Sequence, residues 1–317
     1  MMRSVTARAR WRRWAWAIAS LAPAVVGACT GQTLTLGNSV PSRYHFEAPQ
    51  LVAELRSDAR TDNPTLTADL LEIFFTSDRN GTGDVWTARR STRSQPFAPP
   101  TPVAEVNTST FETSAAISAD GLTLWFGSDR PGGVGLTDIW VSNRPNRTAA
   151  WLTPGNVIPL NTAVDDIPRP PGQHGLVMPL SSKQGSSAVY QTFLATRAST
   201  GASFGTPVLI SELAFPDRST VDGFLTDDGL TLFYSSAPLQ APADGAVTGD
   251  GGVATADLFV AWRRSVNDTF TEAQLLDDLN TPGDERDPWL TPDGKTLYFT
   301  SDRDGALNIY TASVKPR

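Results

Sequence analysis

Acidic residues recur in this 317-residue chain at corresponding places of a repeated pattern, just before the first strand of each repeat. They are Asp62, Glu112, Asp165, Asp166, Asp222, Glu285 and Asp287. Carboxylates that gather at one rim can bind a cation or a basic peptide, and Trp289, beside Pro288, could stack on a sugar or on a peptide side chain. The alternative is that these acids cap turns and neighbour arginines such as Arg286, which keeps the surface soluble.

Two carboxylates that flank a sugar bond can also hydrolyse it, so a glycan-binding module or a glycoside hydrolase is the alternative to a partner-binding site. Catalysis is disfavoured because a catalytic pair needs surroundings that push its two pKa values apart, whereas these acids occupy the same slot of each repeat. The two histidines, His45 and His174, lie far apart and lack metal-ligand spacing. We therefore predict no catalytic residue, no cofactor and no metal.

Two loops resemble calcium-binding loops, because residues 78–84 and 302–305 alternate oxygen-bearing side chains with glycine. The first lacks the distal glutamate of such a loop, since Arg89 stands at its position, so a hairpin turn explains both segments better. The Ser-Asp-Arg triplets at residues 77–79, 128–130 and 301–303 are interpreted as structural. Their aspartates fix turns, and their arginines bridge adjacent repeats.

The pattern that positions these residues recurs five times and is clearest at residues 290–310. Each copy reads as a strand, an Asp-Gly turn, an aromatic strand, a polar turn and a short apolar strand, which is typical of an antiparallel meander. Other copies begin at residues 66, 117 and 225. A decayed copy at residues 174–190 has Val189 and Tyr190 as its third strand.

A second recurring piece, an aromatic residue followed by a Val or Leu and often by Leu-Asn or Val-Asn, supplies a fourth strand to each copy. It spans residues 46–55, 97–107, 151–161, 204–213 and 270–280. Five four-stranded sheets predict an all-β fold, a five-bladed β-propeller. The first outer strand precedes every core hairpin and the last hairpin has none after it, so the two should pair and close the ring. An open solenoid is the alternative.

The run from Pro292 to Arg303, Pro-Asp-Gly-Lys-Thr-Leu-Tyr-Phe-Thr-Ser-Asp-Arg, resembles the WD40-like PD40 repeats of the TolB-type β-propellers. The resemblance covers most of residues 46–314 and is weakest in the third copy, which lacks Asp-Gly. That copy also has Pro179 inside its second strand, and this predicts an irregular blade. The resemblance implies partner binding in the cell envelope and no known reaction.

The first residues of the chain have the features of an export signal. Five arginines precede residues 14–28, which are apolar, uncharged and too short to span a membrane. Residues 26–29 resemble a bacterial lipobox, and Cys29 is the single cysteine, so we predict lipid attachment there; an ordinary cleavage site after Ala28 is the alternative. The predicted organisation is a signal peptide over 1–28, a flexible tether over 29–42 and a propeller over 43–317, with a loop insertion at 239–255.

The charge of the chain narrows the range of partners. The formal net charge of −7 becomes −12 when the five arginines of the signal are removed. Such acidity argues against nucleic acid and against anionic lipid headgroups. We expect an exported protein, anchored to a membrane only by lipid, with its propeller in the periplasm or at the cell surface. Its expected partner is a protein or peptide, with a glycan as the alternative.

Overall fold

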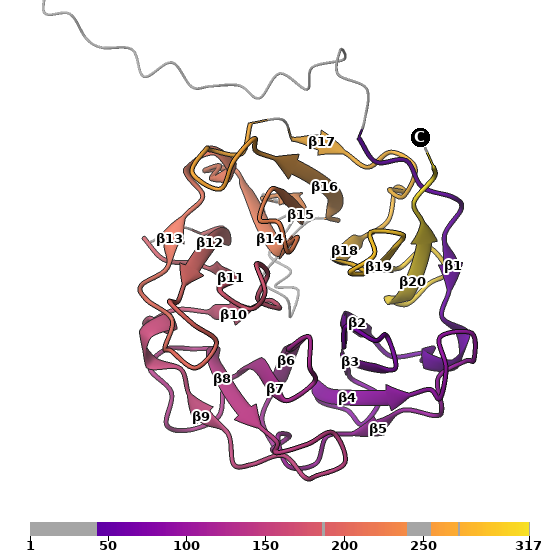
Figure 1. Ribbon diagram of the computed structural model, residues 1–317, viewed down its shortest axis with the longest axis vertical. Coiled ribbons are helices and arrows are strands. Elements are labelled where there is room, and N and C mark those ends of the chain that lie inside the picture. Colours follow the sequence, from indigo (N-terminus) through magenta and orange to yellow (C-terminus); the bar gives the residue numbers. More distant parts are fainter. Residues whose placement is uncertain (1–42, 186–187, 240–254, 272, 317) are drawn as a thin grey trace, which may run out of the picture. The chain divides into compact units, whose positions relative to one another are not determined.

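The computed structural model describes residues 43–185, 188–239, 255–271 and 273–316. Over these residues the chain forms five antiparallel sheets of four strands each, arranged as the blades of a ring (Figure 1). The predicted all-β, five-bladed propeller is therefore confirmed. The predicted signal peptide, lipid attachment site and tether lie outside the described residues, as do residues 240–254 of the predicted insertion. No helix in the described ranges is long and apolar enough to cross a membrane.

Each blade runs from an innermost strand at the channel to an outermost strand at the rim. The first blade contains β2 (Thr61–Leu66), β3 (Glu72–Ser77), β4 (Asp84–Arg89) and β5 (Thr101–Pro102). The second contains β6 (Glu112–Ile117), β7 (Thr123–Ser128), β8 (Asp138–Asn143) and β9 (Gly155–Asn156). The third contains β10 (Asp166–Pro168), β11 (Val177–Ser182), β12 (Gln191–Thr196) and β13 (Val208–Leu209).

The last two blades complete the ring. The fourth contains β14 (Arg218–Leu225), β15 (Thr231–Pro238), β16 (Asp257–Trp262) and β17 (Gln274–Leu275). The fifth contains β18 (Glu285–Leu290), β19 (Thr296–Ser301), β20 (Asn308–Ser313) and, as its outermost strand, β1 (Gln50–Leu51). Short 3-10 helices follow three outer strands: η1 (Ala53–Leu55), η2 (Ile158–Leu160) and η3 (Ser211–Leu213).

The ring closes by pairing its two ends, as predicted. Strand β1 lies antiparallel to β20 with Leu51 opposite Tyr310, and a further bridge joins Phe46 to Val314 (Figure 1). The fifth blade is thus built from both ends of the propeller. This pairing gives β20 a neighbour, so its edge is not open to another chain.

The Asp-Gly turns are held by the same two hydrogen bonds in four blades. Asp293 accepts one from the Thr291 hydroxyl (2.7 Å) and one from the Lys295 N–H (3.2 Å). Gly294 has a φ of 69°, a conformation that glycine adopts without steric cost. The equivalent bonds are made by Asp69, Asp120 and Asp228. In the first blade Leu70 takes the glycine position, with a φ of 61°.

The hydrophobic core consists of five clusters, each lying between two neighbouring blades. Between the first and second blades, for example, Phe74 and Val85 pack with Ile117 and Phe126. Burial of apolar surface contributes about 25 cal/mol per Å². Because this burial joins one blade to the next, the side chains that face the central channel are free to be polar.

The third blade departs from the predicted pattern in two ways. Its third strand is β12, which begins at Gln191, so the assignment of Val189 and Tyr190 to that strand was wrong. The predicted irregularity lies in the innermost strand rather than at Pro179. Strand β11 is regular over six residues, with Pro179 opposite Leu194, whereas β10 has only three residues and lacks the β-bulge that interrupts the other four innermost strands.

Candidate functional site

A cavity of about 640 Å³ opens where the innermost strands begin, and we call this end of the channel the upstream mouth. All five blades contribute to its lining, which includes Arg60, Asp62, Asp78, Phe111, Asp165, Lys183, Tyr190, Asp222, Arg286 and Asp287. The volume is typical of a site for a small ligand or for one or two side chains of a partner. Several of the predicted acids are therefore brought together here, from blades far apart in the sequence.

The predicted acids lie within the innermost strands or directly beside them, and some of them are structural. Glu285 is fully buried and accepts hydrogen bonds from the Thr281 N–H (2.8 Å), the Thr281 hydroxyl (2.8 Å), the Ser301 hydroxyl (2.7 Å) and Arg303 (3.3 Å). Glu112 makes the same set of bonds in the second blade. These two glutamates fix the turn that leads into their blade and do not line the cavity.

Asp166 follows the structural pattern of the glutamates, although with fewer partners. Its Oδ2 accepts hydrogen bonds from the Thr162 N–H (2.5 Å) and hydroxyl (2.7 Å), and burial raises its pKa. Like the glutamates, it is absent from the lining of the cavity. The acids that do line the cavity among those predicted are Asp62, Asp165, Asp222 and Asp287.

A β-bulge directs two of the predicted acids, Asp222 and Asp287, to the channel. In four innermost strands the register shifts after the second or fourth residue, and the residue at the bulge has a positive φ. These residues are Asn63, Ser114, Asp222 and Asp287. A bulge inserts one residue and changes the direction of the side chains that follow. Glu285 and Asp287, two residues apart, therefore have different surroundings.

Asp222 is the lining acid that forms no ion pair in the described part of the chain, whereas Asp62, Asp78, Asp165 and Asp287 each form one. It is partly exposed in the cavity, and no cation lies within ion-pair distance of its carboxylate among the described residues. Burial, followed by repulsion from Asp287, raises the pKa of Asp222 to about 7. Near neutral pH this carboxyl group is therefore divided between its protonated and ionised forms.

Asp62 is more deeply buried than Asp222 and has a cationic partner. Burial raises its pKa to about 6, although the nearby Arg60 opposes the shift. Its Oδ2 lies 3.4 Å from Arg60 Nη1, while its Oδ1 has no hydrogen-bond partner in the described part of the chain. The first and fourth blades thus each present an acid that titrates near neutrality, which is frequent at functional sites.

The cations of the lining are already engaged. Arg60 also pairs with Asp78 (3.0 Å), Lys183 with Asp165 (3.2 Å), and Arg286 with Asp284 (2.8 Å). Tyr190 donates a hydrogen bond to Asp165 (2.9 Å). The charge left for a ligand at the upstream mouth is therefore negative.

Arg169, which the sequence analysis missed, crosses the channel from the third blade. It is 1% exposed, and its Nη1 donates to Asn63 Oδ1 (2.8 Å) and to Asp287 Oδ1 (3.3 Å), on the two blades opposite. Asp287 also accepts bonds from the Thr300 hydroxyl (2.7 Å) and the Asn63 N–H (3.1 Å). The sequence feature that marks it is the Pro-Arg-Pro run at residues 168–170, which stands where the other four innermost strands have a bulge.

Trp289 lies apart from the rim acids. It is 4% exposed and packs on Tyr298, at 5.9 Å between ring centroids, and on Phe224, at 6.0 Å. It lines a second cavity at the opposite end of the channel, where β18 ends. The structure therefore does not place its indole beside Asp222 or Asp287.

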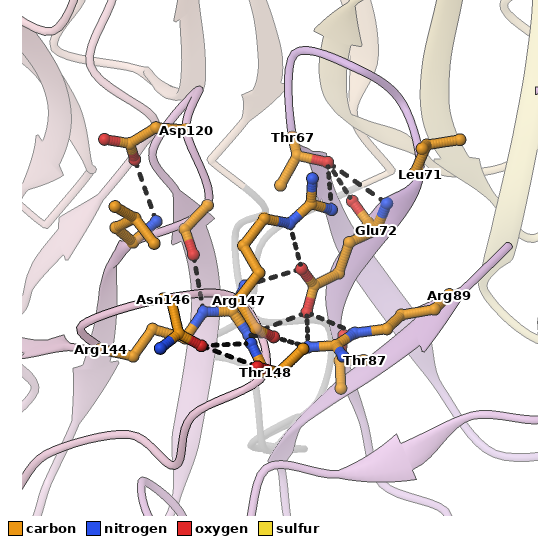
Figure 2. A network of polar contacts seen from close by, with 12 residues as sticks. Thr67, Leu71, Glu72, Thr87, Arg89, Asp120, Arg144, Asn146, Arg147 and Thr148 are labelled. Carbon is orange, nitrogen blue, oxygen red and sulfur yellow. Dashed lines mark hydrogen bonds and ion pairs between the residues drawn. The ribbon is translucent and has the colours of Figure 1, made fainter. Parts of the chain in front are cut away.

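A second polar network missed in the sequence joins the first two blades (Figure 2). Glu72 is fully buried and accepts hydrogen bonds from Arg89 (2.8 Å), Arg144 (2.6 Å) and Arg147 (3.2 Å). Burial opposes ionisation, but hydrogen bonds from Arg144 and Arg89 outweigh it and lower the pKa of Glu72. Both carboxylate oxygens of Glu72 accept hydrogen bonds from these arginines, so we interpret the network as a structural link between the two blades.

Residues of the loops that resemble calcium sites and of the Ser-Asp-Arg triplets make contacts within the chain. No group of three or more His, Cys, Asp or Glu residues is placed to hold a metal within the described ranges. The Asp78 carboxylate binds Arg60, and Arg303 donates to the Leu279 carbonyl (2.6 Å) in the link from the preceding blade. Residues 201–205, Gly-Ala-Ser-Phe-Gly, match the Gly-x-Ser-x-Gly pattern in which some hydrolases carry a nucleophilic serine. In those enzymes the serine stands at a sharp turn from a strand into a helix, whereas residues 201–205 lie between the strands β12 and β13.

The comparisons with known proteins give the fold. No protein-family model matches the chain, and no curated protein sequence matches it. An α-L-arabinofuranosidase from Lactobacillus brevis is 11% identical, with a TM-score of 0.51, over 82% of this chain and 90% of that one. A Hadza microbial sialidase is 11% identical, with a TM-score of 0.50, over 84% and 68%. TolB from Acinetobacter baumannii is 15% identical, with a TM-score of 0.46, over 83% of this chain.

These likenesses describe the fold alone. The chain spans 56% of the length of the Acinetobacter TolB. It is a five-bladed β-propeller with distant structural similarity to TolB and to glycosidases. Function must be argued from the site, since unrelated activities share such folds.

Proposed function

We propose that this protein is a non-enzymatic binding protein of the bacterial cell envelope, and that its upstream mouth receives a cationic side chain of a protein or peptide partner. The observation that carries the proposal is Asp222, a carboxylate open to the cavity and without a cationic partner among the described residues. An ammonium or guanidinium group beside it would favour the ionised form and relieve its repulsion with Asp287.

The rest of the lining supports a side chain as the ligand. The cavity of about 640 Å³ accepts a lysine or arginine side chain with its neighbours but not a folded domain. Phe111 and Tyr190 line the cavity with aromatic rings, and each already lies against a cation of the chain, Arg60 at 5.4 Å and Lys183 at 4.3 Å from the ring centroid. The buried side chain of Arg169 lies across the channel, so a ligand would enter this cavity from the upstream side only.

A defined peptide pair tests this function. The parent should bind an acetylated Gly-Arg-Gly amide, and the same peptide with citrulline, which is neutral and nearly isosteric, should bind about tenfold more weakly. Asp222→Asn should abolish the preference for arginine, whereas Asp227→Asn, at the opposite mouth, should keep it. Calorimetric titration measures both. Equal binding of the two peptides, or an unchanged preference in Asp222→Asn, would refute the proposal.

The proposed location rests on residues 1–28 and on Cys29. Lipid attachment needs the cysteine thiol, so cells fed labelled palmitate should label the parent and not Cys29→Ser. A parent that is cleaved after Ala28 and carries no label would instead indicate an ordinary signal peptide.

A carbohydrate is the second candidate ligand, because the cavity holds two acids, Asp62 and Asp222, with raised pKa values. Glycoside hydrolysis needs one carboxyl group that stays protonated to serve as the acid. Release of nitrophenol from a panel of nitrophenyl glycosides distinguishes the two functions. Turnover by the parent that disappears in Asp222→Asn would establish a hydrolase and overturn the binding proposal.

A further inference from the structure

The opposite end of the channel, where the innermost strands end, contains a second cavity of about 440 Å³, and we call it the downstream mouth. The proposed function does not involve this cavity. Most of its floor is apolar and comprises Tyr44, Leu66, Ile117, Pro170, Phe224, Trp289, Leu290 and Pro292. Its volume lies in the range of small-molecule sites.

Phe224 gives this floor an aromatic surface open to solvent. It is only partly buried, and its ring lies 6.0 Å from that of Trp289, at an interplanar angle of 59°. Apolar surface in a concave site gains about 25 cal/mol per Å² when a ligand covers it. An aromatic or branched aliphatic group is therefore the complement of the floor.

The charged residues that line this cavity are all acidic. Within the described chain they are Asp227, Asp228 and Asp293. A hydrogen bond from the Thr291 hydroxyl lowers the pKa of Asp293, and Lys295 and Arg93 lie near enough to Asp293 to contribute to lowering it, so this carboxylate stays ionised. Within the described residues, Asp227 accepts a bond from the His174 N–H, at 3.2 Å. No lysine or arginine in the lining neutralises them, in contrast to the upstream mouth.

We propose that the downstream mouth binds a small organic cation with an aromatic or branched apolar body. The body packs on Phe224 and Trp289, and the ammonium group lies toward Asp227 and Asp293 at the rim. Charge complementarity with the acidic lining favours this occupant over a neutral or anionic one.

The test uses the full chain carrying Asp222→Asn, so that the upstream mouth does not contribute a cation site. Calorimetric titration compares 2-phenylethylammonium with 2-phenylethanol and 3-phenylpropionate, which share its ring but differ in charge. We expect one ammonium ion bound per chain, roughly fivefold weaker binding of the alcohol, and weaker binding still of the carboxylate. Equal binding of the ammonium ion and the alcohol, or no binding of the ammonium ion, would overturn the proposal.

Matched variants then locate the site. Asp227→Asn combined with Asp293→Asn should weaken binding of the ammonium ion about fivefold and leave the alcohol unchanged. Asp120→Asn is the control, because Asp120 holds the same kind of turn in the second blade but does not line the cavity. Phe224→Leu should weaken both compounds. An effect of Asp120→Asn as large as that of the double variant would overturn the assignment. The assignment would also fail if the parent chain self-associates and this self-association disappears in the double variant, because the mouth would then bind a second copy of the chain.

Discussion

At the upstream mouth the carboxylates lie in strands or directly beside them, close to arginines and a lysine, whereas at the downstream mouth they lie on turns above an apolar floor. Burial raises the pKa of Asp222 to about 7, while a turn hydroxyl lowers the pKa of Asp293. The same side chain therefore carries a pH-dependent charge at one mouth and a permanent charge at the other. The difference arises from the backbone, a bulge in one case and a turn in the other.

Arg169 separates the two mouths. Its guanidinium group reaches from the third blade to the first and fifth blades, and it is buried between them. Because β10 has no bulge, the third blade contributes this cation where other blades contribute Asn63, Ser114, Asp222 and Asp287. Ligands at the two mouths should therefore bind independently.

The first prediction concerns a variant that lacks the Arg169 side chain, and it has the largest expected effect on the free energy of unfolding. Arg169→Met leaves Asp287 buried without its counter-charge and should lower the free energy of unfolding by about 3 kcal/mol. Urea unfolding at pH 8 measures the loss. The double variant Arg169→Met with Asp287→Asn should recover most of it, since the uncompensated charge is gone. A double variant no more stable than Arg169→Met would contradict this account.

The fold was predictable from the sequence because each repeat carries its own turn chemistry. The Asp-Gly turn, the aromatic strand and the outer piece recur, and pairing of the two ends follows from their count. The candidate site was harder, because chain position does not reveal a bulge. Glu285 and Asp287 occupy one strand two residues apart, yet one binds a turn and the other binds Arg169.

The two missed arginine sites have different causes. Arg169 follows Pro168, which stands where the other innermost strands have their bulge residue, and it lies in the one repeat whose pattern had decayed, so the repeat pattern did not single it out. Glu72 stands where other repeats have Thr123, Thr231 or Thr296, and two of its three partners, Arg144 and Arg147, come from the next blade. Its role depends on contacts between repeats, which a repeat pattern does not contain.

The second prediction distinguishes the structural acids from those of the cavity. Glu285→Gln should lower the free energy of unfolding by about 2 kcal/mol, because an amide cannot accept all the bonds that Thr281, Ser301 and Arg303 donate. Glu112→Gln should lose a similar amount in urea unfolding. Binding of the arginine peptide should persist in both. A fully stable Glu285→Gln that no longer binds the peptide would place this residue in the site instead.

The third prediction tests the pH-dependent charge of Asp222. Its folded pKa, about 7, lies above the ordinary value of 3.8, so the folded state holds an extra proton between these values and loses stability as pH rises through them. Asp222→Asn lacks this loss. Since solvent reaches the cavity, we expect only a modest effect: from pH 5 to pH 8 the free energy of unfolding of Asp222→Asn should rise by about 1 kcal/mol relative to that of the parent.

Urea unfolding of both proteins at the two pH values gives this difference, and groups common to both cancel. Asp227→Asn is the matched control, because Asp227 lies on an exposed turn at the downstream mouth. A difference between parent and Asp222→Asn that does not change with pH would show that Asp222 is ionised throughout.

The smallest effect is expected at the downstream mouth. Asp227→Asn and Asp293→Asn should each change the free energy of unfolding by less than about 0.5 kcal/mol. Asparagine keeps an oxygen that can accept the bonds from His174 N–H and from the Thr291 hydroxyl, so the turns survive the loss of charge. Thermal unfolding at pH 5 and pH 8 should give the same small shift. A shift that grows with pH would mean that these carboxylates are coupled to buried groups, and the contrast between the two mouths would then fail.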